Sequence, residues 1–166
     1  MAKRQNVKLA DAVQEAAGQP LDQSLLLSLV GYNCRRAYLT IMPHFEERME
    51  KFQLRAVDFT VISLLNANPN ITQKRLSKAV NVSPPNLAIL LDRLETRGLV
   101  MRQRNPLDKR SQTLVLTAEG SKLCAKAEKT VTELELEATA MLSEDERGQL
   151  VRLLQKIFLA EEAAQE

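Results

Sequence analysis

The sequence predicts a mainly α-helical protein with one small β-hairpin. Helices are indicated by apolar residues that recur every three or four positions through most of the 166 residues. The hairpin is indicated by two strand-like runs, 99–103 and 112–116, which enclose a segment rich in turn-forming residues. The five glycines are few enough to suit a mostly helical chain. The expected order is four helices, two strands, a long helix and a last helix (α-α-α-α-β-β-α-α).

The first two helices are expected in the N-terminal half of the chain. Pro20 suits an early position in a helix, so a long helix is predicted over about 21–42, with a break near Pro43. One or two further turns are expected before a loop near Gln53. Apolar residues then fit a buried second helix over 55–66.

Two short helices are expected next, in close succession. Thr72 is a good N-cap for a helix that ends near Val80. Ser83 is placed to cap the following helix, and Pro84 fits its first position, where a missing N–H group costs nothing. Gly98 is expected to end this helix. Its predicted apolar stripe consists of Leu87, Leu90, Leu91 and Leu94.

Two longer helices are expected after the hairpin. Thr117 is a good cap for a helix over about 118–141. Ser143 and Glu146 have the spacing of a capping box, which predicts a last helix over 144–163. The long helices carry more apolar surface than the short helices and the hairpin can cover. We therefore expect the two chain ends to associate, most simply in a twofold dimer; an intramolecular bundle is the alternative.

Charge is distributed unevenly along the chain. Residues 72–112 hold nine Lys and Arg against three Asp and Glu, a net charge of +6. Residues 1–71 carry +1, and residues 113–166 carry −5. A basic excess on one compact segment beside an acidic remainder indicates a polyanionic partner.

Composition disfavours membrane insertion and catalysis. No apolar run approaches the ~20 residues of a membrane span, and the N-terminal residues lack the apolar core of a signal peptide. We therefore expect a cytoplasmic protein. One histidine, His44, and two isolated cysteines, Cys34 and Cys124, form no metal-binding pattern. With no recognisable nucleophile–base pair, carboxylate pair or phosphate-binding loop, we expect neither an enzyme nor a cofactor.

A short capped helix followed by a basic hairpin is the arrangement of a winged helix-turn-helix, which holds duplex DNA. Such a helix enters the major groove by its N-terminal end, which here presents Ser83, Pro84, Pro85 and Asn86. The hydroxyl of Ser83 and the amide of Asn86 can bond to bases or phosphates, and Pro84 can pack on a thymine methyl group. Simple capping of the helix is an equal alternative for Ser83.

The order of elements resembles the MarR family of bacterial transcriptional regulators. Three motifs carry the resemblance: the segment SPPNLAILLDRLETRGLV at 83–100, the turn Asp108-Lys109-Arg110 and the helix start LTAEG at 116–120. The resemblance covers about residues 20–160. It implies a homodimer that represses genes by binding a pseudopalindromic operator and that releases DNA when a small, often aromatic or phenolic, ligand binds.

The resemblance also implies a division of the chain. Residues 54–117 would form the winged helix-turn-helix lobe that binds DNA. Residues 20–53 and 118–166 would form the helical dimerisation region, and residues 1–19 a flexible N-terminal tail.

The wing and the recognition helix supply the DNA contacts that the resemblance implies. Asp108 would brace Arg110, which reaches into the minor groove, where a guanidinium suits a narrow electronegative channel.

In the recognition helix, many relatives have an arginine at the position of Ile89. The isoleucine of this chain either touches a base methyl group or packs inward. Arg93 has a structural or phosphate-positioning role. A merely solubilising loop is the alternative for the wing. The expected DNA-binding residues are Thr72, Gln73, Lys74, Ser83, Pro84, Pro85, Asn86, Ile89, Arg93, Arg104, Asp108, Lys109, Arg110 and Ser111.

The effector site of the family lies between the DNA-binding lobe and the dimerisation helices. Three of the six aromatic residues fall between Tyr32 and Phe45, next to two arginines, which suits an aromatic carboxylic acid or its CoA thioester. The expected ligand-binding residues are Tyr32, Arg35, Arg36, Tyr38, Met42, His44, Phe45 and Phe59.

Three alternatives stay open at this point. The aromatic residues can belong to the core, and the arginines to the surface. Cys34 lies near arginines that favour a thiolate, so the chain can be a redox-sensing repressor of the same fold. A protein-interaction module on a winged-helix scaffold is a further alternative, which the basic segment speaks against.

Overall fold

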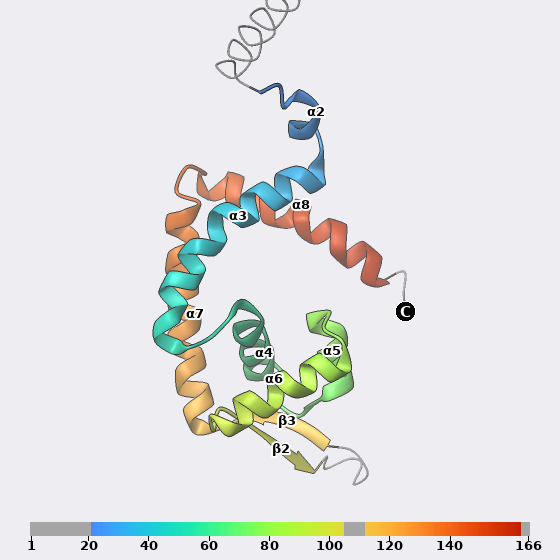
Figure 1. Cartoon of the computed structure of the whole chain (residues 1–166), viewed down its shortest axis with the longest axis vertical. Coiled ribbons are helices and arrows are strands. Elements are labelled where there is room, and N and C mark those ends of the chain that lie inside the picture. The colour runs from blue at the N-terminus through green and yellow to red at the C-terminus, as the bar shows by residue number, and fades with distance from the viewer. Residues whose placement is uncertain (1–20, 105–111, 164–166) are drawn as a thin grey trace, which may run out of the picture. The chain divides into compact units, whose positions relative to one another are not determined.

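The computed structural model describes residues 21–104 and 112–163. The chain divides into two compact units, Met1–Tyr38 and Leu39–Glu166. The described elements are helices joined to a small antiparallel sheet (Figure 1), as the sequence predicts. In the described part of the chain, no helix combines the length and the apolar content that crossing a membrane requires.

The single helix expected over 21–42 is wrong in both of its bounds. A short helix α2 (Ser24–Leu27) precedes a separate, long α3 (Val30–Met49). The side-chain amide of Asn33 donates to the carbonyls of Leu27 and Leu29, both at 2.8 Å, and so satisfies backbone groups at the interruption.

Pro43 lies inside α3 and does not end it. A proline removes one helical hydrogen bond, which ordinarily breaks or kinks a helix. Here the helix continues because Phe45 and Met49, in the next two turns, are buried in the core. Packing of these side chains offsets the lost backbone bond. A short 3₁₀ helix, η1 (Glu50–Phe52), follows directly, and Gln53 then takes a left-handed conformation with φ of 51°.

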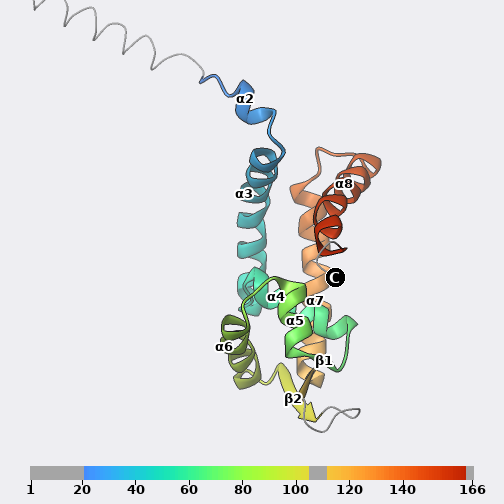
Figure 2. The ribbon, with the colours of Figure 1, turned by 90° about the vertical axis from the view of Figure 1, so that its right-hand side faces the viewer.

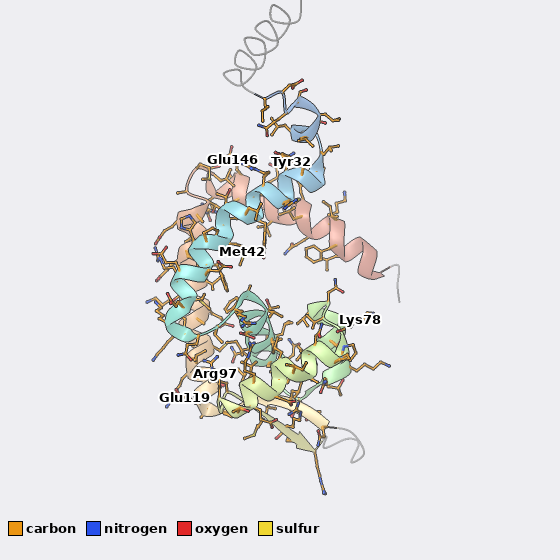
Figure 3. All side chains as sticks on the ribbon, in the orientation of Figure 1. Tyr32, Met42, Lys78, Arg97, Glu119 and Glu146 are labelled. Atoms are coloured by element: carbon orange, nitrogen blue, oxygen red, sulfur yellow. The ribbon has the colours of Figure 1, made fainter. Side chains whose placement is uncertain are left out.

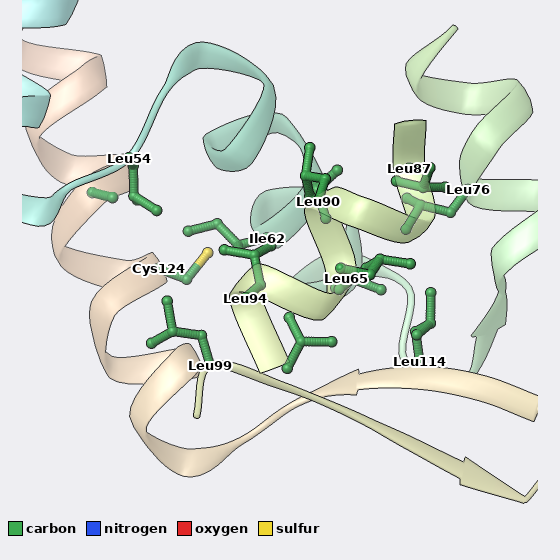
Figure 4. Close-up of a cluster of buried hydrophobic side chains, with 14 of the residues drawn as sticks. Leu54, Ile62, Leu65, Leu76, Leu87, Leu90, Leu94, Leu99, Leu114 and Cys124 are labelled. Carbon is green, nitrogen blue, oxygen red and sulfur yellow. The ribbon is translucent and has the colours of Figure 1, made fainter. Parts of the chain in front are cut away.

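The core of the second unit lies among helices α4 (Ala56–Ala67), α5 (Gln73–Val80), α6 (Pro84–Thr96) and α7 (Ala118–Ala138) (Figure 4). Helix α7 packs along α4 (Figure 2). The predicted stripe of α6 is confirmed, since its four leucines are all buried. The buried apolar residues of the core are Phe45, Met49, Leu54, Val61, Ile62, Leu65, Ile71, Leu76, Leu87, Leu90, Leu91, Leu94, Leu99, Val100, Leu114, Cys124, Ala127 and Leu134.

The predicted hairpin is confirmed. Strand β2 (Val100–Arg104) pairs antiparallel with β3 (Gln112–Leu116), and Val100 lies opposite Leu116. A third strand, β1 (Ile71–Thr72), pairs with the other edge of β3, so the strand order is β1-β3-β2. The sequence did not predict β1, because two residues are too few to show a strand pattern.

Helix caps fix the remaining boundaries. Thr72 Oγ1 accepts from the N–H of Arg75 at 3.4 Å, and Thr117 Oγ1 accepts from that of Gly120 at 2.9 Å. The capping box is confirmed: Ser143 N–H donates to Glu146 Oε2 at 2.8 Å, and Glu146 N–H donates to Ser143 Oγ at 3.3 Å. It starts the predicted last helix, α8 (Glu144–Ala163).

Helix α7 ends at Ala138, three residues before the predicted end. The guanidinium of Arg147 holds the turn that follows, because it donates to Thr139 Oγ1 at 2.9 Å and to the carbonyl of Leu142 at 3.2 Å. These bonds satisfy polar groups of the turn between α7 and α8. Met141, the last residue of the predicted helix, is exposed beyond its end.

Candidate nucleic-acid interface

Helices α5 and α6 form a helix-turn-helix. Asn81 between them has a φ of 50°, a left-handed conformation that Asn tolerates better than most residues. The hydroxyl of Ser77 donates to the carbonyl of Val82 at 2.6 Å, and the N–H of Val82 donates back to the carbonyl of Ser77 at 3.2 Å. These paired bonds, with Leu76 and Leu87 buried on either side of the turn, fix the angle between the two helices.

The N-terminal end of α6 is open to solvent. Ser83, Pro84, Pro85 and Asn86 are all exposed, and burial begins at Leu87. Ser83 occupies the N-cap position as predicted, but its hydroxyl makes no capping hydrogen bond within the described chain. Pro85, at the second helical position, lacks one of the two N–H groups that an N-cap side chain can serve. The polar side chains of this tip are exposed to solvent.

Ile89 lies on the outward face of α6, with 70% of its surface exposed. It is one helical turn beyond Pro85 and opposite the buried Leu90 and Leu91. The alternative that Ile89 packs inward is therefore wrong.

Arg93 anchors α6 to the start of α4. Its guanidinium forms an ion pair with Asp58, a residue that is only 1% exposed. The second carboxylate oxygen of Asp58 accepts from the N–H of Arg55 at 3.0 Å, which fixes the carboxylate at the helix start. The structure thus gives Arg93 a structural partner inside the lobe, and its contact with DNA stays a prediction.

Arg102 connects the hairpin to α6. From strand β2 it donates to Asp92 at 2.6 Å and also forms an ion pair with Glu95. The hydrogen bond with Asp92 raises the pKa of Arg102, so the guanidinium keeps its charge. Asp92 and Glu95 are three residues apart and lie on neighbouring turns of α6, where one arginine reaches both.

Arg97 makes a third connection. Its guanidinium donates to the carbonyls of Gln53 at 2.7 Å and Phe52 at 2.9 Å. Figure 3 shows Arg97 at the end of α6 that lies next to the connection between α3 and α4. Sequence reasoning missed the contacts of Arg97 and Arg102 because their partners are distant in sequence or lie on another element.

The predicted DNA-binding residues of β1, α5 and β2 lie at the surface of the lobe. Lys74 and Arg104 are exposed, and Thr72 and Gln73 are half-buried. Sequence reasoning passed over Arg75, which is also exposed on α5. Near the end of β2, Gln103 donates to the side-chain oxygen of Asn70 at 2.6 Å. Four predicted wing contacts lie outside the described residues: Asp108, Lys109, Arg110 and Ser111.

The expected ligand-binding residues fall in both compact units. Tyr32, Arg35, Arg36 and Tyr38 belong to the first, where the hydroxyl of Tyr32 donates to Gln23 Oε1 at 3.0 Å. Figure 3 shows Tyr32 in the first half of α3 and Met42 in the second.

The other four belong to the second unit. Phe45 is buried and packs edge-to-face on Phe59, with 5.9 Å between the ring centres. Met42 packs against the same core, whereas His44 is exposed. Phe45 thus has the core role that the alternative interpretation assigns to the aromatic residues.

The two cysteines have different surroundings. Cys34 is exposed and Cys124 is buried. The thiol of Cys124 donates to Glu128 Oε1 at 3.4 Å, and the hydroxyl of Ser63 donates to the same oxygen at 2.7 Å. Burial raises the pKa of Cys124 to about 12, so it stays a neutral thiol that packs in the core. In residues 21–104 and 112–163, no group of three His, Cys, Asp or Glu side chains is placed to hold a metal ion.

Comparison with known proteins places this geometry in a family. The model of the MarR family matches residues 54–112, the region that contains α5, α6 and the hairpin. The transcriptional regulator HosA of Escherichia coli O111:H- is 31% identical over 130 residues, which cover 75% of this chain and 96% of HosA.

Solved structures agree over nearly the whole fold. The transcriptional repressor CouR bound to a 23-mer DNA duplex superposes with a TM-score of 0.78 at 36% identity, over 84% of this chain and 99% of CouR. CouR bound to p-coumaroyl-CoA superposes with a TM-score of 0.72 at 34% identity, over 83% of this chain and 97% of CouR. Together with the helix-turn-helix and its hairpin, these matches show that the chain belongs to the MarR family of winged-helix transcriptional regulators.

Proposed function

We propose that the protein is a homodimeric repressor that binds a pseudopalindromic operator and releases it when a small aromatic or phenolic acid, or its CoA thioester, binds. The observation that carries the proposal is the exposed tip of α6, Ser83–Asn86, on a helix that three arginines connect to neighbouring segments of the chain. A rigidly held tip with exposed polar groups is what reading a major groove requires.

The basic groups around the tip supply the second part of DNA binding. Lys74, Arg75 and Arg104 are exposed on the lobe, and the segment that holds them has a net charge of +6. Lys109 would contact a phosphate, and Arg110 would enter the minor groove. Because each neutralised phosphate releases counterions, affinity for DNA falls steeply as the salt concentration rises.

The chain ends support the dimer. Apolar side chains on α8 are exposed in the single chain, although they recur at helical spacing. Burial of such a face in a self-complementary interface is the simplest way to remove it from water. Residues 20–53 and 118–166 would form this dimerisation region, and residues 54–117 the DNA-binding lobe. The exposed apolar residues of α8 are Leu150, Val151, Leu153, Leu154, Ile157, Phe158 and Leu159.

The effector is proposed from chemistry and from one relative. CouR binds p-coumaroyl-CoA, and this chain carries Tyr32, Arg35, Arg36 and Tyr38 on successive turns of α3. Aromatic rings and guanidinium groups suit a phenolic ring joined to a carboxylate or a phosphorylated carrier. We assign the protein no catalytic activity, and as a DNA-binding regulator it would work in the cytoplasm.

The experiment begins with selection of an operator from a random duplex library. Fluorescence anisotropy then measures its dissociation constant with and without p-coumaroyl-CoA or the free phenolic acid. We expect binding to be salt-dependent, Arg110→Ala to weaken it by about tenfold or more, and the thioester to release the duplex. Lys129→Ala is the matched control, because it removes an exposed positive charge outside the basic segment.

Three outcomes would overturn parts of this proposal. Normal operator binding by Arg110→Ala would contradict the role of the wing. Retention of DNA at saturating phenolic acid and thioester would contradict the effector class. Release by a thiol oxidant that disappears in Cys34→Ser would instead establish the redox-sensing alternative, since Cys34 is the exposed cysteine.

A further inference from the structure

The outward face of α6 carries an apolar residue where a DNA-reading helix ordinarily uses polar or charged groups. Ile89 is 70% exposed, and Pro85 lies one turn before it on the same face. An isoleucine exposed to this extent contributes little to the packing of the lobe, since the buried leucine stripe of α6 is on the opposite side. Its surface is free to contact whatever approaches the tip.

The charged groups next to Ile89 are engaged within the lobe. Arg93, one turn further along, pairs with Asp58, and its Nε atom is buried. Asp92 accepts from Arg102 at 2.6 Å. An arginine that reads guanine must extend its guanidinium into the groove, and Arg93 would have to leave the buried Asp58 without its partner to do so. The reading face around Ile89 is therefore apolar in character, with Asn86 as its neighbouring polar group.

The 5-methyl group of thymine is the apolar feature that the major groove presents. We propose that Ile89 is a specificity-determining residue that selects a thymine in each half-site by packing on its methyl group. This inference rests on the proposed DNA binding and names the chemical feature that the recognition helix reads. The contact contributes by removing the methyl group and the side chain from water, so it disfavours a base that lacks the methyl.

The test replaces thymine by deoxyuridine, which removes the methyl group and leaves the hydrogen-bonding groups unchanged. Each thymine of the selected operator is replaced in turn, and the dissociation constant is measured at fixed salt for the natural protein and for Ile89→Ala. At one position per half-site we expect the natural protein to lose about fourfold in affinity, as for one buried methylene-sized group. Ile89→Ala should bind the thymine and deoxyuridine duplexes equally at that position.

Thr96→Ala provides the matched control. Thr96 is exposed at the far end of α6 and bonds to the carbonyl of Asp92 in its own helix. This variant should keep the sensitivity to deoxyuridine. An equal loss in the natural protein and in Ile89→Ala at every position, or a selected operator without thymine in its half-sites, would overturn the role of Ile89 while leaving DNA binding intact. Failure to select any duplex would overturn the proposed function as well.

Discussion

Helices α6 and α8 both carry apolar residues at helical spacing, yet the two apolar stripes differ in how far they are buried. The stripe of α6 is buried within the lobe, where Leu91 is 0% exposed. The stripe of α8 is open, and Ile157 is 58% exposed. Periodicity predicts a helix and its apolar face in both cases. The comparison teaches that periodicity does not indicate whether the partner of that face belongs to the same chain or to another copy.

The largest difference is expected from matched leucine truncations. Leu91→Ala leaves a cavity in the core and should cost about 2–5 kcal/mol of the free energy of unfolding. Leu153→Ala on the exposed face of α8 should leave the unfolding of a dilute monomer nearly unchanged and weaken dimerisation. Chemical denaturation and sedimentation at several protein concentrations separate the two effects. Equal losses of monomer stability would contradict the comparison.

Gly120 in α7 and Gly148 in α8 test the same contrast between a packed and an open helix surface. A Cβ atom at Gly120 would overlap the carbonyl of Leu99, so Gly120→Ala should destabilise the lobe by about 1–3 kcal/mol through strain. At Gly148 in α8 the nearest atom is the flexible end of Arg152, at 3.4 Å. Gly148→Ala should therefore stabilise the helix by up to about 1 kcal/mol. Thermal unfolding of both variants checks the opposite signs.

Two ion pairs test how far burial matters. Asp58 is buried beside Arg93, whereas Glu137 pairs with Arg48 at the surface, with 60% of its side chain exposed. Asp58→Asn should cost about 1–3 kcal/mol, because it leaves the guanidinium without its charge partner. Glu137→Gln should change the free energy of unfolding by less than about 1 kcal/mol. Similar losses in the free energy of unfolding of the two variants, measured by urea titration, would show that the buried ion pair between α4 and α6 contributes no more than the exposed one.

The smallest effect on stability is expected from the cysteines. A thiol reagent at pH 8 should label Cys34, which is exposed, without unfolding the protein. Cys124 should stay unlabelled until the lobe unfolds, because burial raises its pKa to about 12. Mass spectrometry after timed labelling distinguishes the two sites. Labelling of Cys124 in the folded protein would contradict its place in the core.

Local signals predicted many of the helix boundaries. The caps at Thr72, Thr117 and Ser143 and the stop at Gly98 are decided by neighbouring residues, so they can be read from a short window. Pro43 misled the prediction because the packing of Phe45 and Met49, which no local pattern reveals, offsets its cost. The cap role of Ser83 was half correct, because Ser83 occupies the N-cap position but its hydroxyl makes no capping hydrogen bond.

The candidate site divides in the same way. Exposure of the α6 tip followed from the spacing of its leucines. The ties through Arg93, Arg97 and Arg102 depend on how separate elements pack, and Asp58 is 35 positions from Arg93 in sequence. Strand β1 was missed for the same reason, because it exists only through its pairing with β3.

The two ion pairs that Arg102 forms with Asp92 and Glu95 have a mechanical consequence. Because the hairpin strand and α6 share this bridge, it links the strand that leads into the predicted wing to the helix that is proposed to enter the major groove. In the proposed dimer, the wing and the recognition helix of each lobe would then move together. A ligand could not displace one of these elements from the duplex without the other. It would have to change the distance between the two lobes, so release of the operator would be an all-or-none mismatch with the helical repeat of DNA.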